Sequence, residues 1–96
     1  MLFRSLAYLQ VSRNSFVELF PPAENRRPGI VHLALEVENL RELAARLKQN
    51  AVKVEEPRMG RTKALLTFFT DPDGNRIELL EFGPEALQRK AIEEWK

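Results

Sequence analysis

The sequence predicts an α+β fold, in which a β-hairpin precedes one βαβββ module and a terminal helix follows it. Two patterns support this. Several runs alternate apolar and polar residues with a period of two, as half-buried strands do, and one stretch repeats apolar residues at helical spacing. Turn-forming residues separate the runs. A chain of 96 residues that is 44% hydrophobic forms a single domain with a modest core, residues 1–96.

The first part of that domain is a hairpin within residues 1–22. Leu6–Ser12 and Phe16–Phe20 both alternate, and the short polar stretch Arg13-Asn14-Ser15 between them predicts a turn. The next stretch, up to Gly29, holds three prolines and several charged residues, so it cannot continue a strand and forms a connector.

Residues 29–83 are expected to form the βαβββ module. A strand at 30–37 comes first, then a helix at 39–50 that Asn39 and Glu42 cap reciprocally. Further strands follow at 52–56, 64–70 and 76–82, with a loop at 57–63 and a turn at 71–75 in which Gly74 supplies a positive φ.

Strand alternation separates the polar candidates from the apolar face. His32 lies opposite the face that carries Val31, Leu33, Leu35 and Val37. If Ile77 and Leu79 face the helix, Glu78 shares the other side of the sheet with His32. Residues 84–96 form the terminal helix, with Pro84 at its start and a stripe of Leu87, Ala91 and Trp95 that needs something to cover.

Composition excludes several classes of function. A net charge of +1 gives no basis for binding nucleic acid or acidic lipid, and the first residues form neither a secretory signal nor a membrane span, so the cytoplasm is expected. The absence of cysteine removes disulfides and thiolate metal sites. His32 and the carboxylates remain as the strong metal ligands.

Three stretches resemble the vicinal oxygen chelate superfamily, which includes glyoxalase I, methylmalonyl-CoA epimerase, extradiol dioxygenases and the fosfomycin and bleomycin resistance proteins. They are Gly29–Val37, the helix 39–50, and Phe68–Phe82, whose DPDGN turn leads into an IEL strand. Residues 7–22 are similar to the third and fourth strands of a preceding module. The resemblance implies a glyoxalase-like fold of two βαβββ modules, the first of them lacking its opening strand, helix and second strand here.

The resemblance also implies a metal site, since the family takes ligands from the first and fourth strands of each module. His32 and Glu78 match the second module's ligands, and Glu18 matches the first module's remaining one. Either the hairpin completes the site within one chain, or modules from two chains pair. In the second case each pocket contains His32 and Glu78 from both chains. A homodimer is expected on both routes, and the stripe of the terminal helix, from the same chain or from its partner, could cover the bare apolar face of the hairpin.

The implied function is that of a metal-dependent lyase or isomerase, lactoylglutathione lyase-like or epimerase-like, that stabilises an enediolate. Zn, Ni, Co, Mn or Fe(II) suits nitrogen and oxygen ligands, and Glu78 or Glu18 serves as the base. The substrate is a small molecule such as a thiol conjugate, whose anionic tail Arg58, Arg61 and Lys63 could hold. Extradiol dioxygenases rank lower because they need two histidines.

Two other classes of function stay open. One is a metal-free binding protein of the resistance or sequestration type, whose pocket is lined by Tyr8, Phe16, Phe69 and Leu80. The other is a truncated subunit that serves as an interaction module. Without the family resemblance, a single histidine on a strand is more often structural than a ligand.

Overall fold

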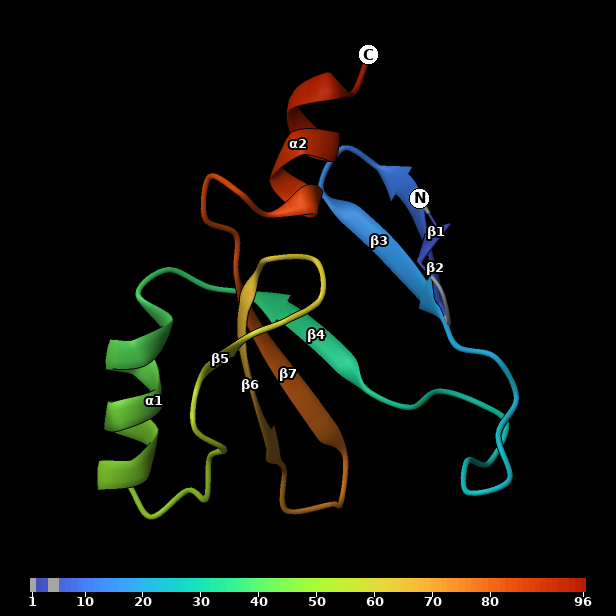
Figure 1. Cartoon of the computed structure of the whole chain (residues 1–96). Coiled ribbons are helices and arrows are strands. Elements are labelled where there is room, and N and C mark those ends of the chain that lie inside the picture. Colours follow the sequence, from blue (N-terminus) through green and yellow to red (C-terminus); the bar gives the residue numbers. More distant parts are fainter. Residues whose placement is uncertain (1, 4–5) are drawn as a thin grey trace. The chain divides into compact units, whose positions relative to one another are not determined.

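The chain is divided into two compact units, which are coloured along the sequence in Figure 1. The computed structural model describes residues 2–3 and 6–96. The hairpin unit comprises residues 1–29 together with 91–96, and the module unit comprises residues 30–90. Each unit has its own sheet. The predicted α+β class is confirmed.

The hairpin unit holds a three-stranded antiparallel sheet in the order β1-β2-β3. β2 spans Leu6–Ser12, as predicted, and β3 spans Ser15–Leu19, one residue earlier than predicted. β1, Leu2–Phe3, pairs with β2 and was not predicted. A strand of two residues carries too little alternation to be seen in the sequence.

The two faces of this sheet differ in the residues that they carry and in how exposed those residues are. Leu9 pairs with Val17 on one face, and Tyr8 pairs with Glu18 on the other. The apolar side chains of the first face remain about half exposed: Leu9 49%, Val11 59%, Val17 44% and Leu19 50%.

The helix α2 (Leu87–Glu94) does not provide the expected cover. Its Ala91 carbonyl accepts a hydrogen bond of 3.1 Å from Nε2 of Gln10, which is paired with Phe16 on the face opposite the apolar one. Trp95 follows the end of the helix and is exposed. The prediction that the stripe of α2 covers the apolar face of its own hairpin is therefore wrong.

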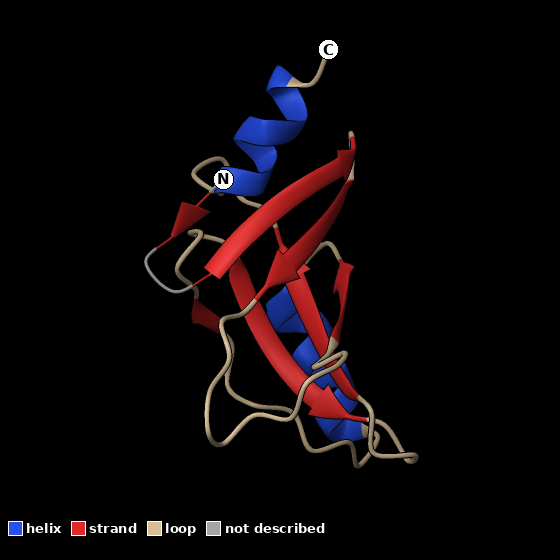
Figure 2. Ribbon diagram, turned by 90° about the vertical axis from the view of Figure 1, so that its right-hand side faces the viewer, coloured by secondary structure: helices blue, strands red, loops and turns tan. Residues whose placement is uncertain are grey.

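The module unit confirms the βαβββ order. Its sheet has the order β4-β7-β6-β5, with β4 (Leu33–Glu36) parallel to β7 (Arg76–Glu81) and antiparallel pairs elsewhere. Helix α1 (Leu40–Gln49) connects β4 to the later strands and lies against β6 (Leu65–Thr70) and β7, behind the sheet in Figure 2. Between them lie the fully buried side chains of Leu40 and Thr67.

Two strand boundaries differ from the prediction. β4 begins three residues later than expected: its pairing with β7 starts at Leu33, which lies opposite Ile77, the second residue of β7. Residues 52–56 do not form the predicted strand. β5 is Arg58–Met59, inside the predicted loop. Glu55 makes one backbone bond to Phe68, but its carbonyl is taken by the Thr67 hydroxyl, so no ladder forms there.

The N-terminus of α1 is capped by a residue that is distant in the sequence. Asn39 has φ 50° and its side chain makes no capping bond, so the predicted reciprocal cap with Glu42 is wrong. Instead, Oε1 of Glu81 accepts the Leu40 N–H at 2.8 Å. A carboxylate at this end of a helix satisfies a free donor and interacts favourably with the helix dipole.

The turn between β6 and β7 is rigidly built. Gly74 has φ 88°, as predicted. The carboxylate of Asp71 accepts bonds from the backbone N–H groups of Asp73 and Asn75 and from the Asn75 side chain. These bonds, the Asn75 side-chain bond first among them, lower the pKa of Asp71 below its ordinary value.

Candidate metal centre

The site lies on the face of the module sheet that is turned away from α1, called the open face below. Glu81 reaches the first turn of α1, which places the odd-numbered residues of β7 on the helix side. Glu78 therefore projects from the open face, on an interior strand of the sheet. Its position is the predicted one.

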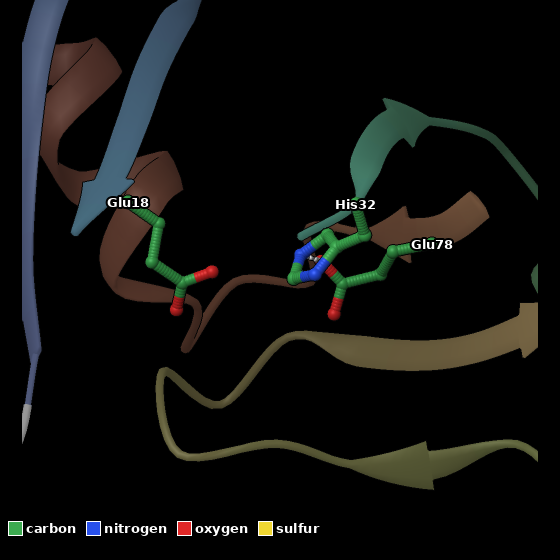
Figure 3. A group of neighbouring side chains, drawn as sticks. All are labelled: Glu18, His32 and Glu78. Atoms are coloured by element: carbon green, nitrogen blue, oxygen red, sulfur yellow. Dashed lines mark ion pairs between the residues drawn. The ribbon is translucent and has the colours of Figure 1, made fainter. Parts of the chain in front are cut away.

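His32 and Glu78 meet on the open face. Nε2 of His32 lies 3.3 Å from Oε1 of Glu78, and the two side chains are only 12% and 10% exposed. Figure 3 shows this pair with its dashed contact. His32 comes just before β4, and its alternation with Ala34, which pairs with Glu78, sends it to the same side. The predicted proximity of these two residues is borne out by this contact.

Phe68 forms the third part of this group and was not predicted from the sequence. Its ring contacts the imidazole of His32 edge-on, with the centroids 5.3 Å apart and the planes at 86°. Phe68 pairs with Glu78, whereas Phe69 pairs with Ile77 on the helix side. Phe69 thus does not line the open face, contrary to the prediction. If the strands on either side of the 71–75 turn are taken to pair symmetrically about residue 73, Phe68 lies opposite Glu78 and Phe69 opposite Ile77. That assumption would have distinguished the two phenylalanines from the sequence.

The pair has donor geometry suited to one metal ion. Ligand atoms at about 2.0–2.2 Å from a metal lie roughly 3.0–3.5 Å from each other when they are neighbours in its coordination shell. The 3.3 Å distance between Nε2 of His32 and Oε1 of Glu78 falls in that range. An imidazole nitrogen and a carboxylate oxygen suit zinc, nickel, cobalt, manganese and iron.

Glu18 belongs to the hairpin unit. It lies on β3, on the face that also holds Tyr8, and its side chain is half-buried. On the same face the rings of Tyr8 and Phe16 meet edge-on, with centroids 6.3 Å apart. The hairpin unit therefore has one apolar face and one face that carries Glu18 and the two aromatic rings.

The basic residues proposed to hold an anion are only partly gathered. Arg58, in β5, forms an ion pair of 3.3 Å with Glu55, while Arg61 and Lys63 lie in the turn that follows β5. Arg76, which was not predicted to belong to this cluster, pairs with the same Glu55 at 2.9 Å. The exposed basic pair on this sheet is thus Arg58 and Arg76.

Comparisons with known proteins identify the family. The profile of the glyoxalase/bleomycin resistance protein/dioxygenase superfamily matches residues 12–79. An uncharacterized protein of Escherichia coli (strain K12), YaeR, is 41% identical over 66 residues, which are 65% of this chain and 51% of that protein. The chain therefore spans about half the length of this curated relative.

Solved structures agree. The glyoxalase family protein from Enterococcus faecalis is 35% identical with a TM-score of 0.56, over 69% of this chain and 59% of that one. The protein SMU.1112c is also 35% identical, with a TM-score of 0.56, over 66% and 51%. Among the described residues, no helix has the length and apolar character needed to cross a membrane.

Proposed function

Because the chain belongs to the glyoxalase/bleomycin resistance protein/dioxygenase superfamily, we propose that it forms a metal-dependent lyase or isomerase site around His32 and Glu78. Glu18 is proposed as a further ligand, contributed by the hairpin unit. The substrate would be a small molecule with two neighbouring oxygen atoms, such as a thiol conjugate of an α-oxoaldehyde.

The observation that carries the proposal is the 3.3 Å contact between Nε2 of His32 and Oε1 of Glu78. Both side chains are largely withdrawn from water, and buried polar groups are costly unless they have a partner. The pairing of the sheet leaves the position of Glu78 little freedom to vary. Glu78 lies in the interior strand β7, which is paired on both sides, so its position is fixed by two ladders.

A bound divalent cation would supply Lewis-acid stabilisation of the negative charge that develops on substrate oxygens. The chain's own residues would do the rest. Glu78 or Glu18 would accept the proton from the carbon next to the substrate carbonyl and return it to the adjacent carbon, the role of a general base and acid. His32 would orient Glu78, and Phe68 would exclude water on one side of the imidazole.

Two chains are proposed to assemble as a homodimer. The half-exposed apolar face of the hairpin unit needs cover, and exposed apolar patches often mark protein interfaces. Pairing of two module units would bring together two histidines and two glutamates, and an octahedral ion held by these four residues would keep two positions open for the substrate oxygens. In the alternative, the Glu18 of each chain completes a site of three ligands.

The test is metal content, measured on purified untagged protein by elemental analysis, with the molecular mass from light scattering. We expect about one metal ion per site, lost in His32→Ala and in Glu78→Ala. Glu36→Ala is the matched control, because Glu36 is an exposed carboxylate on the same face of β4 and should leave the metal content unchanged. Glu18→Ala then distinguishes the two assemblies.

No bound metal after zinc, nickel, cobalt, manganese and iron(II) have each been offered would contradict the proposal. That result would favour the second candidate, a metal-free binding protein. One observation supports this candidate: the imidazole of His32 and the carboxylate of Glu78 lie 3.3 Å apart, close enough for each to be the polar partner of the other.

A further inference from the structure

We propose that Arg58 and Arg76 form an oxyanion subsite beside the His32–Glu78 pair, which selects substrates carrying a carboxylate or phosphate group. The subsite lies wholly within the module unit. Its assignment as a substrate site depends on the function proposed above, but its capacity to bind an anion does not. It extends the predicted basic cluster by adding Arg76 and defining where the anion would lie.

The two arginines share the open face with the metal-binding pair. Arg58 pairs with Leu66, and Leu66 pairs with Leu80, two residues from Glu78 on β7. Arg76 also lies two residues from Glu78, on the other side. Alternation along each strand therefore sends both guanidinium groups to the face that carries His32 and Glu78.

Phe68 forms the base of the subsite. Cζ of Arg76 lies 4.0 Å from the centroid of the Phe68 ring, and Cζ of Arg58 lies 6.0 Å from it. Contacts of this kind hold a guanidinium in place by cation–π attraction. The Phe68 residue itself is only 8% exposed. Arg76 is thus held in position before any ligand arrives.

Glu55 shows what the pair can bind. One of its carboxylate oxygens lies 2.9 Å from Nη2 of Arg76, and the other lies 3.3 Å from Nη1 of Arg58. The backbone of Glu55 is tied to β6, through its N–H to the Phe68 carbonyl and through its carbonyl to the Thr67 hydroxyl. A carboxylate from the chain itself therefore bridges both guanidinium groups.

The charge and the exposure of these three side chains favour binding of an anion from solvent. Two guanidinium groups face one carboxylate, so the trio keeps one positive charge. The side chains of Arg58, Arg76 and Glu55 are 57%, 43% and 44% exposed. Ion pairs at this exposure contribute little to stability, on the order of 0–1 kcal/mol. An incoming oxyanion can therefore displace the Glu55 carboxylate at small cost.

The position of Arg76 relative to His32 defines the class of substrate that could reach both. Arg76 and His32 both contact Phe68, so guanidinium and imidazole are separated by no more than the sum of their distances to its ring. A small organic acid or phosphate ester can span that interval. Its acidic end would lie on the arginines, and its reacting oxygens would lie at His32 and Glu78.

Calorimetric titration of the metal-free protein at low ionic strength tests the subsite. The probes are malonate and inorganic phosphate, with neutral malonamide as the control ligand. We expect Arg76→Gln and Arg58→Gln to weaken binding of the preferred probe by roughly tenfold each. Arg41→Gln, which removes the same charge from the exposed side of α1, should change it less than about twofold.

Glu55→Gln is the most discriminating variant. It removes the carboxylate that competes for the two arginines, so binding of the preferred probe should become several-fold stronger. The preference between malonate and phosphate identifies the anionic group. The proposal is overturned if malonamide binds as well as malonate, if the arginine variants bind like wild type, or if Glu55→Gln weakens binding. The two proposals are separated by titrating the metal-free protein, because anion binding is then measured whether or not His32 and Glu78 hold a metal.

Discussion

Strands β3 and β7 carry the same local pattern and have different surroundings. Val17-Glu18-Leu19 and Ile77-Glu78-Leu79 each place a glutamate between two aliphatic residues. In β7 the aliphatic side faces α1, and Leu79 is 4% exposed. In β3 the corresponding Leu19 is 50% exposed. The pattern assigns residues to faces in both strands. The degree of burial depends on whether a helix packs against the apolar face.

The largest expected difference between the strands is in stability. Leu79→Ala should lower the free energy of unfolding by about 2–4 kcal/mol, since it opens a cavity between the sheet and α1. Leu19→Ala should cost less than about 1 kcal/mol in a monomer, because that side chain is half solvated already. Urea denaturation of both variants measures this. Equal losses would mean that the apolar face of β3 is covered in solution, and a loss for Leu19→Ala that grows with protein concentration would identify a second chain as the cover.

The next prediction concerns the cap that only β7 provides. Glu81→Gln should destabilise the module by about 1 kcal/mol, because a charged acceptor is lost from the first N–H of α1. Glu42→Gln is the control, since the Glu42 side chain takes no part in a cap here. Thermal unfolding followed by circular dichroism compares them. If Glu42→Gln were the more harmful change, the reciprocal cap predicted from the sequence would be the correct one.

The smallest effect is expected at the turn that joins β7 to its neighbour. The pKa of Asp71 is lower in the folded chain than in the unfolded one, chiefly because of its bond to the Asn75 side chain. Its carboxylate therefore stabilises the fold above the ordinary aspartate pKa. That contribution falls away as the pH drops through the lowered pKa in the folded state. Asp71→Asn should flatten this acid limb of the stability profile, whereas a limb of unchanged slope would assign it to other carboxylates.

Much of the module could be predicted because its signals are local. The 71–75 turn, the helix at 39–50 and the alternation around His32 and Glu78 each depend on neighbours in sequence, and each led to the observed element or face. The same holds for the hairpin, where the short turn fixes the pairing of β2 with β3.

The failures involve partners that are distant in sequence. Asn39 and Glu42 have the spacing of a cap, but Glu81 takes that place from 41 residues away. Residues 52–56 alternate like a strand, yet the Thr67 side chain replaces a backbone partner there. Phe68 and Phe69 are equivalent by composition, and only the register with Glu78 separates them. The association of Arg76 with Arg58 was not predicted, because it depends on contacts that both arginines make with Glu55 and with the Phe68 ring.

The bond between Leu40 and Glu81 also affects the order of folding. The hairpin closes over a few residues, whereas this bond and the parallel pairing of β4 with β7 each require a loop of about forty residues to close first. The first turn of α1 is therefore secured only after β7 has docked. The Leu40 amide proton should consequently exchange with solvent only when the whole module opens, and its exchange rate would report the global stability of that module.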